Sequence, residues 1–127
     1  MTLETGVRIF AIIHLGTMGI SHIVAHRAWA EFFIMLREKG NAGVFVVGFM
    51  SLGFGSIIAA FHPVWTGLPL VLTLLGWAQV LKGLIYFTFP AYGLKKLEMV
   101  SLERSRMFVA AGIGLLVLAQ MILATVL

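Results

Sequence analysis

The chain has 127 residues and a net charge of +4, and its composition excludes an ordinary soluble domain. Hydrophobic residues make up 61% of the chain and charged residues 11%, against roughly 25% charged residues in soluble domains. The mean hydropathy of +1.05 indicates that lipid is the main solvent. Because the chain has no cysteine, disulfides, thiolate metal sites and cysteine nucleophiles are excluded.

Four apolar segments each reach the length of about 20 residues that a helix needs to cross a bilayer. Their apolar runs are continuous, without the alternation that a membrane β-barrel requires. We therefore expect an all-α membrane protein with a single transmembrane domain and four transmembrane helices in two hairpins. The expected spans cover residues 7–25, 42–61, 65–89 and 107–126.

The connections between these spans differ in length. Only a short turn at residues 62–65 separates the second and third spans, so we expect these two helices to be antiparallel neighbours. Residues 27–39 carry aromatic and leucine side chains at helical spacing. This pattern predicts a short amphipathic helix in the headgroup plane, or a continuation of the first span. Gly40 then supplies a break, and residues 91–106 could hold another short surface helix.

A weak internal repeat accompanies this layout. Leu15-Gly16 is followed by His22, and Leu75-Gly76 is followed at the same spacing by Lys82. A duplication would relate a hairpin of the first two spans to a hairpin of the last two.

Positive charge predicts the orientation of the spans, because cytoplasmic loops carry an excess of Lys and Arg. Arg8 lies on the opposite side from the two long connections, and Lys82 lies inside the third span. We expect both termini on the non-cytoplasmic side and, since the charge is explained by topology, no nucleic-acid partner. The other seven basic residues all lie in the two long connections: Arg27, Arg37, Lys39, Lys95, Lys96, Arg104 and Arg106.

Lys82 is the most informative single residue. A charged group near the centre of a membrane costs on the order of 2.5–3.5 kcal/mol by insertion measurements. It could serve as an anion-binding or gating residue, or it could extend its long stem toward the headgroups. Both interpretations remain open from the sequence.

One of the two histidines inside the first span, His22, lies near Lys82 in depth. His14 and His22 are eight residues apart on one helix face, and His22 lies about 9 Å from the centre of its span. Lys82 lies about 7 Å from the centre of the third span, toward the same side. We predict an intramembrane polar cluster of His14, His22, Gln79 and Lys82 that favours an anion. Alternatively, these side chains bond to backbone carbonyls.

Metal sites and acid-dependent catalytic sites would need residues that the apolar segments do not contain. His22 and His26 are four residues apart, a spacing at which two imidazoles can share a metal, but no third ligand has suitable spacing. We therefore expect no metal, no cofactor and no catalytic residues, and no enzyme activity. Acid-dependent catalysis and cation coupling would need a carboxylate in the membrane. All five acids lie outside the apolar segments: Glu4, Glu31, Glu38, Glu98 and Glu103.

Small residues form a stripe on the second span, at Gly48, Ser51, Gly55 and Ala59. Such residues let helices approach closely, and packing is the main force that joins helices in lipid. The stripe predicts a helix-packing surface whose partner is either in this chain or in another one. The fourth span carries a shorter version with Ala110 and Gly114.

A loose pattern surrounds the third span. It consists of His-Pro-Val-Trp at residues 62–65, Gly-Trp and Lys-Gly within residues 75–83, and a proline at the end of residues 89–90. In this pattern the chain resembles small bacterial four-span membrane proteins of uncharacterised function. The resemblance implies four spans and a bacterial inner membrane, and it implies no activity.

Three functions remain open at this stage. The first is a membrane protein that acts through helix–helix contacts, as a homo-oligomer or as an accessory subunit of a larger membrane complex. The second is a channel or transporter for an anion or small neutral solute that uses Lys82 and His22. The third is a membrane subunit that holds a cofactor through His14, His22 and His26.

Overall fold

A computed structural model describes residues 1–127 and contains helices but no strands. Four of the helices are long and apolar enough to cross a membrane, which confirms the expected all-α fold with four candidate spans. Two shorter helices lie in the long connections. In chain order the helices are α1 (Leu3–Val24), α2 (His26–Glu38), α3 (Asn41–Phe61), α4 (Leu70–Thr88), α5 (Pro90–Leu97) and α6 (Arg106–Ala124).

Local chemistry explains where the first helices begin and end. The Thr2 side chain accepts a hydrogen bond from the Thr5 backbone N–H, so α1 begins earlier than the apolar run alone predicts. A kink at Ala25 separates α1 from α2, which makes α2 a helix of its own rather than a continuation of the first span. Gly40 has a φ of +63°, a conformation that favours glycine, and it turns the chain from α2 into α3.

The start of α4 corrects the predicted third span. The sequence places that start near residue 65, but α4 begins at Leu70. Gly67 has a φ of +73°, which breaks the helix, and Pro69 occupies the N-cap position. Apolar composition continues through this turn, so hydropathy alone could not locate the boundary.

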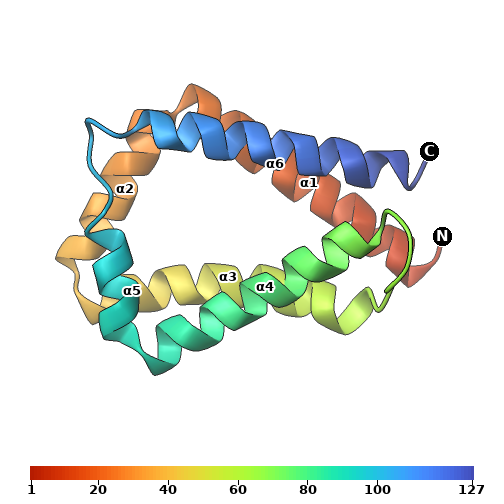
Figure 1. Cartoon of the computed structure of the whole chain (residues 1–127), viewed down its shortest axis with the longest axis horizontal. Helices are drawn as coiled ribbons and strands as arrows, with labels where there is room; N and C mark the ends of the chain where they lie inside the picture. Colours follow the sequence, from red (N-terminus) through yellow and green to blue (C-terminus); the bar gives the residue numbers. More distant parts are fainter.

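The long helices form two antiparallel pairs, α3 with α4 and α1 with α6 (Figure 1). The neighbours expected across the short turn, α3 and α4, are confirmed. A duplication would instead pair the first span with the second and the third with the fourth. The structure does not have these two pairs. The connectors α2 and α5 are long enough to carry the chain from one pair to the other, so helices that are consecutive across them need not pack together.

Glycines explain this pairing. A Cβ atom at Gly55 would lie 2.6 Å from the Gly76 carbonyl oxygen, and one at Gly112 would lie 2.6 Å from the Gly19 carbonyl oxygen. Only glycine permits such close approach of two backbones. The small-residue stripe on α3 therefore packs against α4 within the same chain, since Gly48 also approaches Phe87.

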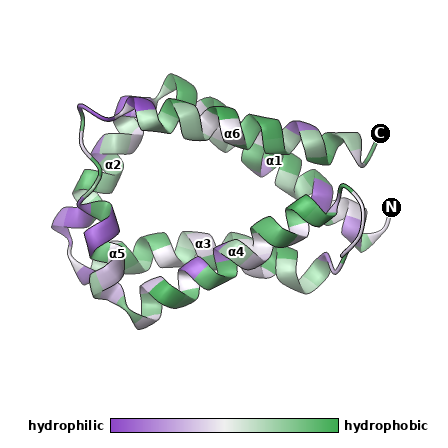
Figure 2. Cartoon of the chain, viewed as in Figure 1, coloured by the Kyte–Doolittle hydropathy of each residue, from purple (hydrophilic) through white to green (hydrophobic).

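The two pairs converge at one end of the molecule and are held apart at the other (Figure 1). We call the first the closed end, which contains both chain termini and the α3–α4 loop. The second is the connector end, which contains α2 and α5. Figure 2 shows that apolar residues cover the long helices, whereas hydrophilic residues gather at the connector end and near the termini.

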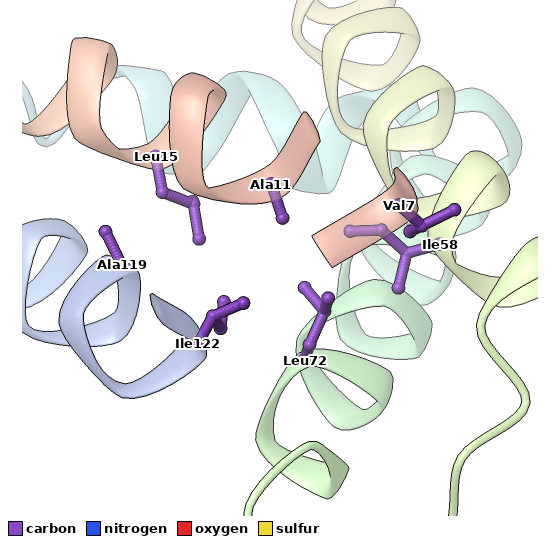
Figure 3. Close-up of a cluster of buried hydrophobic side chains, with 7 residues drawn as sticks. All are labelled: Val7, Ala11, Leu15, Ile58, Leu72, Ala119 and Ile122. Carbon is purple, nitrogen blue, oxygen red and sulfur yellow. The ribbon is translucent and has the colours of Figure 1, made fainter. Parts of the chain in front are cut away.

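A buried hydrophobic cluster joins all four long helices toward the closed end (Figure 3). Ile58 and Leu72 come from one pair and are fully buried. Their partners in the other pair include Leu15 and Ile122. The full cluster consists of Val7, Ala11, Leu15, Ile58, Leu72, Ala119 and Ile122.

Candidate functional site: a polar cavity between the helix pairs

A cavity of about 180 Å³ lies between the two helix pairs, on the connector side of the hydrophobic cluster. Five helices contribute to its wall, and most of the lining is apolar. Four polar side chains interrupt that lining: His14 and His22 from α1, Ser51 from α3 and Gln79 from α4. The cavity thus brings together three of the four residues of the predicted polar cluster.

Aromatic stacking holds the His14 ring at the cavity wall. Its centroid lies 4.6 Å from that of Phe54, with 25° between the ring planes. Phe10 lies one helical turn earlier and packs on both rings, with centroids 5.8 Å away in each case. Because Phe54 belongs to α3, the histidine connects the two helix pairs.

His22 and Trp29 form the wall at the connector side. The Nδ1 atom of His22 lies 2.7 Å from the Met18 carbonyl oxygen, and its ring stacks on Trp29 with centroids 4.3 Å apart. The Trp29 indole N–H donates to the Ser21 hydroxyl at 2.8 Å. Since the Met18 carbonyl can only accept, the Nδ1 atom of His22 carries the proton, which leaves Nε2 as an acceptor when the ring is neutral.

His14 and Gln79 retain unused hydrogen-bonding capacity. The side-chain hydrogen bonds of the structure involve neither residue, whereas every fully buried side-chain nitrogen or oxygen has a partner. The polar atoms of His14 and Gln79 are therefore accessible, and both residues line the cavity. An imidazole and a carboxamide together can donate to and accept from one bound molecule.

Lys82 lies away from these three residues. It is exposed on α4, and its ammonium group lies 5.5 Å from the centroid of the Tyr86 ring. Tyr86 is one turn nearer the connector end, so the lysine stem extends toward that end of the helix. Lys82 thus lines a different cavity from His22.

His26 has a different hydrogen-bond partner from His22. Its Nδ1 atom lies 2.9 Å from the Ser105 hydroxyl, beside the start of α6. This contact joins α2 to α6 at the connector end. The two histidines of the i, i+4 pair therefore have separate partners on α1 and at the start of α6.

The sequence did not reveal a polar network at the closed end, formed by Arg8, His62 and Thr73. The Thr73 hydroxyl donates to the Val64 carbonyl oxygen at 2.6 Å, so it accepts from His62 Nδ1 at 2.9 Å. The Arg8 Nε–H donates to His62 Nε2 at 3.0 Å. His62 must therefore be neutral, with its proton on Nδ1.

This network ties α1 to the loop between α3 and α4. His62 and Thr73 are both fully buried. Burial and the nearby Arg8 guanidinium lower the pKa of His62, and Glu4 opposes that shift. No spacing rule links Arg8 to residues more than fifty positions away, which is why sequence patterns gave no signal for it.

Comparisons with protein-family models, with curated proteins and with solved structures find no match to this chain.

Proposed function

We propose that this protein binds a small neutral solute between its two helix pairs and passes it across a bacterial inner membrane. The observation that carries the proposal is the cavity with free hydrogen-bonding groups on His14 and Gln79. Polar groups in a membrane interior are costly, and they commonly mark a substrate pathway. A bundle that served only as a scaffold would gain nothing from leaving them unpaired.

The size and lining of the cavity limit the solute. A buried cavity of about 150 Å³ accepts a benzene molecule, so about 180 Å³ suits a single ring or a molecule of similar size. No Lys, Arg, Asp or Glu lines the cavity, so no fixed charge compensates the desolvation of a charged solute. These properties favour the neutral-solute form of the transporter hypothesis over the anion form.

Trp29 is the proposed gate at the connector side. It lines the central cavity and also a second cavity of about 240 Å³ between α1 and α2. Its ring is held by His22 and by the bond to Ser21. We propose that rotation of this one side chain connects the two cavities. At the other side, passage requires the hydrophobic cluster of the closed end to separate.

Nicotinamide and nicotinate provide a matched pair of probes, since they share one ring and differ in charge. In a Trp65→Phe/Trp77→Phe protein, Trp29 is the only tryptophan and reports on the cavity. We expect a saturable change in its emission with nicotinamide and none with nicotinate. Gln79→Leu should weaken nicotinamide binding by roughly 3- to 10-fold, the effect of one lost hydrogen bond.

Proteoliposome uptake of labelled nicotinamide then tests passage. Leu74→Ala is the control, because Leu74 lies on the same helix as Gln79, is 54% exposed and does not line the cavity; its removal should change neither binding nor uptake. A linear, non-saturable emission change that Gln79→Leu leaves unaltered would rule out the cavity as a binding site. Saturable binding without uptake would limit the function to binding.

The proposed orientation places the connector end in the cytoplasm and both termini outside. The seven basic residues of the two long connections support this orientation. These two connections are also joined to each other, because the Arg37 guanidinium donates to the Val100 carbonyl oxygen at 2.8 Å. The cysteine-free chain allows a direct test with single cysteines. A membrane-impermeant maleimide should label Thr66→Cys in intact cells but Glu103→Cys only after lysis; the reverse pattern would invert the orientation.

Action through helix–helix contacts is the second candidate, favoured by one feature of α6. Ala110 and Gly114 are exposed, and the space beside Gly114 is open. Another membrane helix, from a second copy or a larger complex, could pack there. The native mass of the protein after gentle extraction from membranes tests this candidate. A monomeric mass that is the same in the Gly114→Leu variant would speak against it.

The same sample tests the third candidate, a membrane subunit that holds a cofactor. A bound pigment or haem would absorb visible light.

A further inference from the structure

Another concave site lies on α4 and α5, and it shares no lining residue with the central cavity. Its volume is about 290 Å³. Two lysines and two tyrosines line it near the connector end: Lys82, Tyr86, Tyr92 and Lys96. The solute-binding function proposed above does not use this site.

Each lysine is held by an aromatic ring. The Lys82 ammonium lies 5.5 Å from the centroid of Tyr86, and the Lys96 ammonium lies 5.4 Å from the centroid of Tyr92. A cation within about 6 Å of an aromatic face is attracted by it. Both positive charges are therefore fixed on one concave surface, from two different helices.

The rest of the site is apolar and follows a single helix face. Ala78, Leu81 and Ile85 recur on α4 at intervals of three and four residues, which places them in one row. Leu81 is 56% exposed, so this row faces the lipid. The site thus has a cationic part toward the connector end and an apolar part toward the membrane interior.

This division matches the two parts of a phospholipid. We propose that the site binds an anionic phospholipid, with its phosphate between Lys82 and Lys96 and one acyl chain along Ala78, Leu81 and Ile85. Basic pockets at the ends of membrane helices suit anionic headgroups. A free phosphate would use the lysines but leave the apolar row without a role. The position of Lys82, costly for a helix that only packs in lipid, is explained by this ligand.

Native mass spectrometry of the full chain in a neutral detergent tests the proposal. We expect the protein to retain a phosphatidylglycerol at least tenfold more strongly than a phosphatidylcholine of the same acyl chains. Lys82→Gln and Lys96→Gln should each lower phosphatidylglycerol retention by about tenfold. Lys95→Gln is the matched control, because Lys95 is the neighbour of Lys96 on α5 and does not line the site.

Several outcomes would overturn the proposal. Equal retention of the two lipids, or an equal loss in Lys95→Gln, would show that only general surface charge attracts the lipid. Displacement of the lipid by millimolar inorganic phosphate would show that the acyl chain contributes nothing. If Lys82→Gln does not fold, Lys96→Gln still decides the question, because Lys96 lies on the exposed face of the short helix α5.

Discussion

The interface within each helix pair differs in kind from the interface between the pairs. Within a pair, backbones approach each other at Gly19 and Gly112, or at Gly55 and Gly76. Between the pairs, side chains make the contact, through the hydrophobic cluster, the stacked rings of His14 and Phe54, and the Arg8–His62 bond. Backbone contact leaves no room for rearrangement, whereas side chains can change rotamer. The pairs therefore form rigid units, and any movement that opens the cavity is expected between them.

Disrupting the interface within a pair should have the largest effect. In Gly55→Leu the new side chain meets the Gly76 carbonyl and the Val80 amide, which cannot move aside without separating α3 from α4. We expect a loss of about 3 kcal/mol in unfolding free energy, measured by denaturation in mild detergent. Gly53→Leu is the control on the same helix, since the space beside Gly53 is open. Equal effects of the two variants would contradict backbone contact.

A smaller effect is expected from the hydrophobic cluster between the pairs. Leu72→Ala removes a fully buried side chain and leaves a cavity. We expect a loss of about 2 kcal/mol, near the lower limit for such substitutions, because lipid solvates exposed apolar groups as well as the protein does. Leu74→Ala, whose side chain is 54% exposed, should be nearly neutral. If the pairs separate here during transport, Leu72→Ala should also raise nicotinamide uptake.

The smallest expected effect is a pH dependence of the closed end. His62 must be neutral to accept from Arg8, and its pKa in the folded protein is lower than its ordinary value of 6.5. Below about pH 6.5 the unfolded chain therefore binds more protons than the folded one. Stability should be constant above that pH and fall as the pH decreases further.

His62→Gln gives the control for this pH dependence. A glutamine can accept from Arg8 and donate to Thr73, but it does not titrate. The variant should remain folded and lose the acid-dependent fall in thermal stability between about pH 6.5 and 5. A fall of the same size in His62→Gln would assign it to other groups.

The four spans and the amphipathic α2 could be predicted because each depends on a local property, either apolar length or residues at helical spacing. The partner of α1 could not, since Gly19 and Gly112 are far apart in the sequence and carry no side-chain signal. The orientation of α4 about its own axis could not be predicted from the sequence either. Depth along the helix placed Gln79 and Lys82 at similar levels, but only the packing of α4 in the folded chain decides that Gln79 lines the central cavity and Lys82 does not.

The pairing of the first helix with the last also bears on how the protein is made. During synthesis α1 enters the membrane before its partner exists, and the glycine surface around Gly19 remains uncovered until α6 has been translated. The hairpin of α3 and α4 needs no such delay, because its two helices are neighbours in the chain. We therefore expect assembly to end with the capture of α1 by α6, the last helix to be translated.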